Sequence, residues 1–412
     1  MSDGNTVPRK SSETWDVVVI GAGPAGSVAA RQLARRGQRV LLVDRKKFPR
    51  DKVCGACLNR RGQSVLHAIG LDALLASPHV AAPRRFELQA GGRQVGLTLD
   101  GMLAVRRSWF DEQLVEAAKR AGVTVVEQTE GRLVGGPPSV PENNRDKHNN
   151  RDKHTVVLRP VGTSSPGAAR GITTSLVVAA DGLGNPSCRD LHQPGGFTEQ
   201  VAPASLIGWG ACFASRHSFF QPGTIYMGVG PHGYVGAVRL AGGELNVGAA
   251  IDPAWVRQAA SPHRVTEELF RQCGFPIPAE LHDAPWRGTP RLTRQARPVA
   301  RDGVFLIGDA AGYVEPFTGE GIAAALATGA AVVPFAMEAL AGNPRRAARG
   351  WHARYRQLVT RRNRWCRRLA WMLRKPHRCR LPMRLLASWP RLSAPIVHHL
   401  QRSVAPAELG LP

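Results

Sequence analysis

The sequence predicts an α/β fold with three parts: a parallel sheet covered by helices, an inserted antiparallel sheet, and a basic helical region at the C-terminal end. Two apolar strand patterns, residues 17–20 and 304–307, each run into a glycine-rich turn, which is typical of nucleotide-binding α/β sheets. Between them, residues 200–251 alternate short strand patterns with turns, and this spacing indicates antiparallel strands. With 412 residues, 43% of them hydrophobic, the chain can bury a full core in two or three domains.

The first glycine-rich turn follows the strand pattern at 17–20 and opens a predicted helix over 24–36. A second predicted strand, 39–43, ends at Asp44, eighteen residues after Gly26. This is close to the ~20 residues expected before a carboxylate that binds a ribose. The charge of Asp44 would repel a 2′-phosphate and favours an unphosphorylated adenosine ribose. The sequence therefore predicts a dinucleotide site formed by Gly21, Gly23, Ala25, Gly26, Asp44 and Arg45.

The second glycine-rich turn, from Gly308 and Asp309 to Gly312, is predicted to have the same form of strand, tight turn and helix start. A helix start offers unpaired N–H groups and partial positive charge, which suits a pyrophosphate. The Asp309 carboxylate can accept a hydrogen bond from a ribityl hydroxyl. Two such turns far apart in the chain indicate FAD, because a molecule that extends from adenosine to flavin needs a second anchoring point.

A third segment is predicted to contact the flavin ring. Residues 316–321 lead into a helix expected to start at Ile322, and N–H groups there would stabilise negative charge at the flavin N1 and O2 atoms. Gly319, Gly321 and Ile322 are therefore predicted cofactor residues. The apolar run over 322–337 is shorter than the ~20 residues of a membrane span. The favoured interpretation is a buried helix that covers the nucleotide-binding sheet.

These patterns divide the chain into a Rossmann-like FAD-binding domain, an inserted substrate domain and two terminal segments. The hairpin pattern at 85–99, with its turn at Gly91 and Gly92, is expected to join the antiparallel strands. A tandem hexamer, 143–148 and 149–154, is interpreted as a solvated hairpin loop. Further predicted elements are a helix over 107–121 and strands over 123–127, 176–180, 206–213, 224–229, 234–240 and 244–251. The predicted segments are 1–14 for a disordered tail; 15–84, 106–190 and 291–345 for the FAD-binding domain; 85–105 and 191–290 for the substrate domain; and 346–412 for the basic helical region.

The charge distribution points to the C-terminal region as a contact surface. The formal net charge is +24, and residues 339–407 hold seventeen Lys and Arg with no Asp or Glu, which leaves about +7 on the rest of the chain. Trp and Leu are interleaved with Arg in this region. Two interpretations stay open: an interfacial helix on an anionic bilayer, and a solvated helix that caps the body. Nucleic acid is not favoured as a partner.

Cysteine content and the N-terminus bear on the compartment. The seven cysteines are scattered and odd in number, and their spacing resembles neither a zinc ribbon nor a secreted disulfide framework. Residues 1–14 are polar and contain no apolar signal core. The expected location is therefore the reducing cytoplasm, with the basic region able to place the protein at the inner face of a membrane. No metal site is predicted, and no oligomeric state is indicated.

The motifs resemble a known superfamily. In their order and spacing, the turns at Gly21 and Gly308, together with Asp44 and Asp181-Gly182, resemble the para-hydroxybenzoate hydroxylase superfamily of flavoproteins. Two strings narrow the resemblance. Residues 48–55 read Phe-Pro-Arg-Asp-Lys-Val-Cys-Gly and resemble the Phe-Pro-Arg-x-Lys-x-Cys-Gly string of geranylgeranyl reductases, and residues 315–322 resemble their flavin-contacting loop. The resemblance covers roughly residues 15–345.

The resemblance implies roles for further residues. Asp181 and Gly182 would lie near FAD and near the route of a transient NAD(P)H donor. Arg107 would hold the phosphate or ribose side of FAD, with the adjacent Arg106 as the alternative equivalent. Cys54 would lie near the flavin and line the substrate pocket.

Cys54 and Tyr234 are the candidate catalytic residues. Cys54 and Cys57 form a Cys-x-x-Cys, for which a redox pair and a buried apolar cysteine are the alternative interpretations. Tyr234 matches the Tyr-x-Trp-x-Phe-Pro-Lys string that geranylgeranyl reductases carry on a substrate-domain strand. Gly236 stands where that string has Trp, and Phe-Pro-Lys is absent. Gly236 is expected to leave more room beside the flavin.

Sequence and resemblance together predict an FAD-dependent oxidoreductase. It would reduce a carbon–carbon double bond of a small, apolar, isoprenoid-like molecule, with NAD(P)H or another carrier as electron donor. The alternative on the same fold is an FAD-dependent monooxygenase that hydroxylates or epoxidises an apolar or aromatic substrate. A halogenase is less favoured, since no Trp-x-Trp-x-Ile-Pro string occurs and no lysine lies between Lys52 and Lys119. A flavin-binding protein without catalysis is the remaining interpretation.

Overall fold

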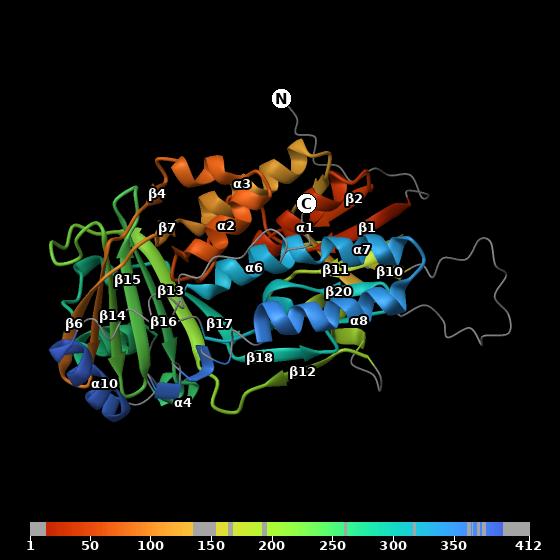
Figure 1. The fold of residues 1–412 in the computed structure, drawn as a ribbon. Coiled ribbons are helices and arrows are strands. Elements are labelled where there is room, and N and C mark those ends of the chain that lie inside the picture. Colours follow the sequence, from red (N-terminus) through yellow and green to blue (C-terminus); the bar gives the residue numbers. More distant parts are fainter. Residues whose placement is uncertain are drawn as a thin grey trace.

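The computed structural model describes residues 14–134, 154–163, 168–191, 196–258, 262–315, 319–360, 364, 366–368, 371–372 and 376–389. Two large sheets stand at opposite ends of the molecule, and most helices lie over the first of them (Figure 1). Except for Thr14, the predicted disordered tail lies outside the described residues, and so does the tandem hexamer except for His154.

The first large sheet has eight strands. They are β1 Trp15–Ile20, β2 Val40–Val43, β8 Thr124–Val126, β9 Thr129–Val134, β10 His154–Pro160, β11 Arg170–Ala179, β19 Ala300–Arg301 and β20 Val304–Leu306. The order along the sheet is β19-β20-β11-β1-β2-β8. Strand β10 pairs antiparallel with β11, and β9 pairs antiparallel with β10. Strands β2 and β20 are buried at every position, as expected for apolar runs in a sheet covered on both faces.

The strand order brings the three cofactor motifs to one edge of this sheet. Strands β1 and β20 pair with β11 on either side, and both pairings are parallel. Strand β1 ends just before Gly21, β11 just before Asp181, and β20 just before Gly308. Ligands of open α/β sheets bind at the carboxyl ends of parallel strands. Motifs that lie far apart in sequence therefore meet at one site.

Six helices belong to this part of the molecule: α1 Pro24–Ala34, α2 Arg60–Ala68, α3 Arg107–Arg120, α6 Glu320–Ala331, α7 Val333–Leu340 and α8 Pro344–Tyr355. The helices predicted over 24–36 and 107–121 are confirmed to within two residues. The stretch from Glu320 to Leu340 is long and apolar enough to cross a membrane, yet 61% of its most apolar window is buried inside the protein. It packs against α1 and α2, as predicted for a core helix.

The second large sheet has seven strands in the order β17-β13-β16-β15-β14-β5-β6. Their bounds are β5 Arg85–Ala90, β6 Arg93–Thr98, β13 Ile207–Ala214, β14 Thr224–Gly230, β15 Gly233–Arg239, β16 Glu244–Ile251 and β17 Arg287–Arg291. All neighbours are antiparallel except β5 and β14. The predicted strands, and the hairpin at 85–99 that joins them, are confirmed. Part of this sheet packs against helix α5 Pro262–Gln272 through a cluster that includes Phe220, Phe270 and Phe275.

Two small sheets and a short helix complete the body. One sheet consists of β3 Cys57–Leu58, β4 Val80–Ala81 and β7 Leu103–Val105, and the other of β12 Thr198–Val201, β18 Arg294–Arg297 and β21 Gly312–Tyr313. Helix α4, Pro253–Gln258, precedes α5. Short 3-10 helices lie at Asp72–Ala76, Pro186–Leu191, Ala279–Leu281 and Gly308–Ala310.

The predicted helix start after the second glycine-rich turn is wrong. Residues Gly308–Ala310 form a single 3-10 turn, and the chain then enters strand β21, which pairs with β18. Gly312 causes the change, because its φ of 155° lies outside the helical range. The next helix, α6, begins only at Glu320, two residues before the predicted start at Ile322.

The C-terminal region has two different environments. Helix α8 belongs to the core of the first domain, where Trp351 is fully buried and donates a hydrogen bond from Nε1 to the Leu306 carbonyl over 3.1 Å. A π-helical turn, Arg356–Thr360, continues it. Helix α10, Pro376–Ser388, instead packs against β5 and β6 of the seven-stranded sheet (Figure 1). The predicted domain boundaries stay a prediction, but α8 shares the core of the domain before it.

Candidate active site

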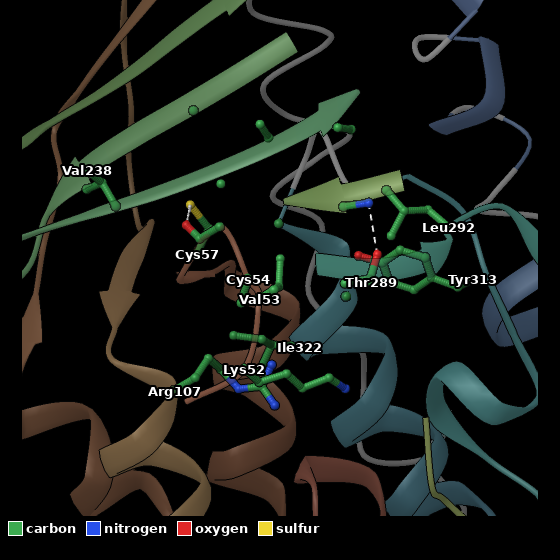
Figure 2. Close-up of a pocket in the computed structure, with 18 of the residues that line it drawn as sticks. Lys52, Val53, Cys54, Cys57, Arg107, Val238, Thr289, Leu292, Tyr313 and Ile322 are labelled. Carbon is green, nitrogen blue, oxygen red and sulfur yellow. Dashed lines mark hydrogen bonds between the residues drawn. The ribbon is translucent and has the colours of Figure 1, made fainter. Parts of the chain in front are cut away.

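A deep pocket lies between the two large sheets, and eleven of the predicted site residues line it. Figure 2 shows Lys52, Arg107 and Ile322 at one end and Val238 of the seven-stranded sheet at the other. The predicted residues in its wall are Gly23, Ala25, Cys54, Arg107, Gly182, Tyr234, Gly308, Asp309, Gly319, Gly321 and Ile322. Of the other predicted residues, Gly312 borders a neighbouring cavity, and Gly21, Gly26, Asp44, Arg45 and Asp181 are not in the wall.

The first turn has the geometry of a phosphate cradle. A Cβ atom on Gly26 would lie 1.8 Å from the carbonyl oxygen of Gly21, so helix α1 can approach the strand only because position 26 has no side chain. At Gly23, by contrast, the nearest atom to an added Cβ is Nη2 of Arg50, at 3.7 Å. Gly26 thus serves close packing, and Gly23 leaves open the side of the turn that a pyrophosphate needs. These residues fit the cofactor that the two turns predict.

The two glycine-rich turns touch each other. A Cβ on Gly308 would lie 2.9 Å from the Cβ of Ala25. Nζ of Lys52 binds Asp309 Oδ2 over 3.2 Å and lies 3.6 Å from the position of a Cβ on Gly182. Lys52 therefore stands where the three motifs meet. The sequence analysis did not assign Lys52 to the site, although the residue lies inside the string at 48–55.

Asp181, next to Gly182 in the chain, carries a buried carboxyl oxygen atom. Its Oδ2 accepts a hydrogen bond from the Ser187 amide over 2.7 Å, whereas Oδ1 has no hydrogen-bond partner among the described residues. Burial raises the pKa of this carboxyl to about 6, and the bonds from Ser187 and the charge of Arg45 oppose the shift. A buried acceptor without a donor is costly, and this one lies directly before Gly182, which does line the pocket.

Asp44 lies beside the first turn, as predicted, and is held by the backbone. Its carboxylate accepts hydrogen bonds from the Ala22 amide at 2.8 Å and the Lys46 amide at 2.9 Å. Arg50, which was not predicted as a site residue either, bridges two carboxylates. Its Nη2 lies 3.5 Å from Asp44 Oδ2, and its Nη1 lies 3.3 Å from Asp111 Oδ2. A guanidinium placed between Asp44 and the open side of the turn can pair with a phosphate. Arg45 itself is exposed.

The structure distinguishes the two adjacent arginines. Arg107 lines the pocket and makes a bidentate ion pair with Asp111, with N–O distances of 2.8 and 2.7 Å. Arg106 instead binds Glu244 of the seven-stranded sheet over 2.6 Å. Only Arg107 therefore faces the predicted cofactor, and Asp111 fixes its guanidinium in place.

The N-terminus of α6 closes the cofactor end of the pocket. Gly319 is the left-handed residue before the helix, and a Cβ there would lie 3.0 Å from the Cβ of Cys57. The buried Glu320 carboxylate accepts bonds from Arg61 at 3.1 Å and Asn59 at 3.0 Å. These contacts tie the helix start to α2. Residues 316–318 of the predicted loop lie outside the described residues.

The other half of the pocket is apolar. Its wall comes from strands β5, β6, β14 and β15, from the segment before β7, and from the C-terminal helices. Its apolar side chains include Phe86, Leu88, Leu97, Leu99, Met102, Ile225, Met227, Val238, Met372 and Leu386. None of these was assigned to the site from the sequence, because apolar residues on strands do not differ in pattern from ordinary core residues.

Tyr234 and Gly236 both line the pocket from strand β15. Tyr234 is 4% exposed and lines the pocket from β15. A Cβ on Gly236 would lie 3.2 Å from Cε of Met227 on the neighbouring strand β14. Met227 thus occupies part of the space that a side chain at position 236 would use, and the expectation of more room beside the flavin stays a prediction.

Cys54 and Tyr313 are the groups nearest the junction of the two halves. Cys54 lines the pocket, and the Cys57 thiol donates to the Gly55 carbonyl over 3.2 Å. Burial and the neighbouring Cys54 raise the pKa of Cys57 to about 12, which disfavours a reactive thiolate pair. Burial and Asp309 hold the pKa of the Tyr313 phenol well above its usual value, so it stays protonated. The sequence signal for Tyr313 was only its position directly after Gly312.

Comparisons with known proteins support this assignment. Residues 14–243, more than half of the chain, match the family described as "FAD binding domain". The chain is 30% identical to menaquinone reductase of Mycobacterium tuberculosis over 77% of its own length and 75% of that protein. It is 27% identical to digeranylgeranylglycerophospholipid reductase 1 of Methanococcoides burtonii, covering 80% and 76% of the two chains.

Other matches define the limits of the likeness. Conditioned medium factor receptor 1 of Dictyostelium discoideum is 27% identical over 75% of this chain, which spans only 60% of that protein. The myxobacterial chondrochloren halogenase CndH superposes with a TM-score of 0.70 at 19% identity, over 93% of this chain and 90% of its own. At that identity the match shows the fold alone. The chain belongs to the family of FAD-binding-domain proteins, within the geranylgeranyl reductase-like branch of the para-hydroxybenzoate hydroxylase superfamily, and it is an FAD-dependent oxidoreductase.

Proposed function

We propose that this enzyme reduces a carbon–carbon double bond in an apolar, isoprenoid-like molecule, with NAD(P)H or another carrier as the electron donor. The observation that carries the proposal is the apolar half of the pocket, which is continuous with the cofactor cradle. Burial of a hydrocarbon chain against leucine, isoleucine, valine, methionine and phenylalanine side chains is favourable by about 25 cal/mol per Å² of apolar surface removed from water. Bound FAD would supply the two-electron chemistry, and the protein would supply binding and orientation.

The names of two relatives support the substrate class. One is a menaquinone reductase and the other a digeranylgeranylglycerophospholipid reductase, and both names refer to molecules with isoprenoid chains. Their matches cover three quarters or more of this chain, so they include both large sheets.

Reduction of a double bond also needs a proton donor beside the substrate. Cys54, Tyr234 and Tyr313 all line the pocket at or near the junction of its two halves. The raised pKa of Tyr313 keeps its phenol protonated at neutral pH. Cys54 and Tyr234 remain the proposed catalytic residues, and Tyr313 joins them as a third candidate proton donor.

An oxygen-dependent reaction is the second candidate function. Strand β15 carries Gly236 where geranylgeranyl reductases carry tryptophan, so the substrate side departs from the reductase pattern. Halogenation is less favoured, because the pocket lysine, Lys52, is paired with Asp309 on the cofactor side.

Product mass separates the candidates. The purified protein with FAD would be titrated anaerobically with NADH and NADPH, then given menaquinone or a digeranylgeranylglycerophospholipid. The proposal expects bleaching of the flavin absorbance and, without oxygen, a product that remains two mass units heavier than the substrate after any quinol has been reoxidised to the quinone, because reduction of a quinone ring alone adds the same mass. A product sixteen units heavier, formed only with stoichiometric oxygen uptake, would replace it with the monooxygenase. A flavin that no donor reduces would favour a non-catalytic flavoprotein.

A further inference from the structure

Helix α10 has one face that belongs to the pocket and another that faces solvent. Cys379 and Met383 are buried against the seven-stranded sheet, and Leu386 on the same side of the helix lines the pocket. Met372, just before α10 in the chain, lines the pocket as well. Cys379 and Met383 therefore anchor the helix on the sheet, and Leu386 on the same face borders the apolar half of the cavity.

The opposite face exposes large apolar side chains. Leu381 is 65% exposed, Leu385 38% and Trp389 62%, and Trp371 beside the helix is 60% exposed. Only five other large apolar side chains among the described residues are exposed to a comparable degree, and they are scattered over the chain. A local concentration of Trp and Leu in solvent marks a contact surface rather than ordinary surface variation.

Positive charge surrounds these apolar side chains. Arg380 and Arg384 are exposed one turn apart on α10, on the side of the helix next to Leu381. Arg378 lies over the ring of Trp371 at 4.0 Å and donates to its carbonyl over 2.9 Å. The sequence places no acidic residue between positions 339 and 407. The surface thus combines Trp and Leu with cations from a stretch of sequence that carries no carboxylate side chain.

We propose that the outer face of α10, with Trp371, docks on an anionic lipid bilayer, and that an apolar substrate enters the pocket from the bilayer beside this helix. Interfacial helices pair an apolar stripe with Lys or Arg in this way, and the cations bind anionic headgroups. The positive charge of this surface excludes a basic partner. Burial of its apolar stripe in a bilayer would be favourable, and nucleic acid would not provide that burial. Figure 1 shows α10 at the outer end of the seven-stranded sheet, next to β6.

The route follows from the two faces of one helix. Leu386 borders the cavity, and Leu385 and Trp389 are exposed within one turn of it. A long apolar molecule that leaves the bilayer at α10 would cross little water before it reaches the pocket. This part of the proposal rests on the proposed function, whereas the docking part does not.

Docking is tested by sedimentation of the full-length, FAD-loaded protein with vesicles of phosphatidylcholine, with and without 30% phosphatidylglycerol. Binding is expected only with the anionic lipid and is expected to weaken as salt is added. Reversal of two charges in Arg380→Glu with Arg384→Glu should weaken binding by about 30-fold or more, since each cation near the surface contributes about 1 kcal/mol. Replacing the apolar residues, Leu381→Ser with Leu385→Ser, should weaken it by a similar factor.

Matched variants control for net charge and for exposure elsewhere. Arg35→Glu with Arg120→Glu reverses two exposed charges on the nucleotide-binding domain, and Val161→Ser with Ile277→Ser removes two exposed apolar side chains. Both are expected to bind vesicles within twofold of the unaltered protein. Equal weakening by the control and the α10 charge pairs would overturn the docking surface. So would tighter binding of the protein to RNA or DNA than to anionic vesicles, or a dimer that the Leu381/Leu385 variant abolishes while vesicle binding is unchanged.

The route is tested with the same variants and a polyprenyl substrate presented in two ways. The Arg380/Arg384 variant should lose turnover of vesicle-borne menaquinone by tenfold or more and keep turnover of menaquinone in detergent micelles. Equal rates from vesicles for the variant and the unaltered protein would overturn the route. If vesicles bind but no menaquinone is reduced in either form, the proposed function fails for this substrate while the docking surface stands.

Discussion

The two halves of the pocket are built by different means. At the cofactor end, chain segments approach so closely that glycine is required: a Cβ on Gly26 would lie 1.8 Å from the Gly21 carbonyl oxygen, and one on Gly308 2.9 Å from Ala25. At the substrate end, apolar side chains from many separate segments form the wall. Backbone contacts allow one residue type, whereas apolar packing allows many of similar volume. The cofactor end should therefore tolerate substitution poorly, and the substrate end should tolerate compensated exchange.

The largest expected effect is at Gly26. Gly26→Ala should abolish retention of FAD, because the new methyl group would displace helix α1 from the turn that holds the pyrophosphate. The readout is the flavin absorbance of the purified protein together with the far-UV spectrum, which reports whether it folds. Gly171→Ala is the matched control, since a Cβ there meets only Thr155, at 3.9 Å. A yellow Gly26→Ala protein with normal affinity for FAD would refute the cradle.

Asp309 should show a large but incomplete effect. Its carboxylate faces the pocket and is paired with Lys52 over 3.2 Å. Asp309→Ala should weaken FAD binding roughly 10- to 100-fold, the effect of losing one hydrogen bond to a charged group. Fluorescence titration of the apoprotein with FAD gives the affinity. Asp302→Ala, in an exposed ion pair with Arg301, should change it less than twofold. Equal effects at both positions would remove Asp309 from the cofactor site.

The sequence could predict the cofactor end because its determinants are local. Glycines, an acid after the second strand and a Gly-Asp turn are each recognised from a short stretch of sequence. Nine of the eleven predicted residues in the pocket wall were predicted as cofactor residues. Strand order then brought the motifs together. The direction of the chain after Gly312 was not predictable in the same way, because β21 exists only through its pairing with β18.

The substrate end depends on contacts between distant segments, which the sequence does not display. Met227 fills the space beside Gly236 from the neighbouring strand, and Leu386 reaches the pocket from a helix near the other end of the chain. Lys52 and Arg50 were not predicted for a similar reason. Whether a cation in a loop belongs to a site depends on the carboxylates near it in space, which the sequence does not display. Contacts between distant segments are therefore harder to predict from the sequence than local motifs are.

At the substrate end, a large substitution and a compensating small one should have a moderate effect on stability, which tests whether this end tolerates exchange better than the cofactor end. Gly236→Trp alone should lower the free energy of unfolding by about 1–3 kcal/mol, because the ring would overlap Met227. Adding Met227→Ala should restore much of the loss by making room. Thermal denaturation measures both, and FAD content should stay within twofold throughout. If Met227→Ala makes the Gly236→Trp protein less stable still, the two positions do not share this space.

The smallest expected effect concerns the charge of Asp181, and it separates folding from cofactor binding. Burial raises the pKa of this carboxyl to about 6 in the folded protein, above its ordinary value of 3.8. The folded state therefore binds the proton more tightly than the unfolded state, so this group stabilises the fold below about pH 4, and that contribution is lost as the pH rises through about 6.

Asp181→Asn keeps an acceptor for the Ser187 amide and removes the buried charge. In the absence of FAD it should stabilise the protein by about 1–2 kcal/mol at pH 7.5 and by much less at pH 4.5. Denaturant titration at the two pH values measures the difference, with the exposed Asp302→Asn as control. An equal effect of Asp181→Asn at both pH values would show that the carboxyl is not held at a raised pKa, and that the cofactor end is less desolvated than its backbone contacts indicate.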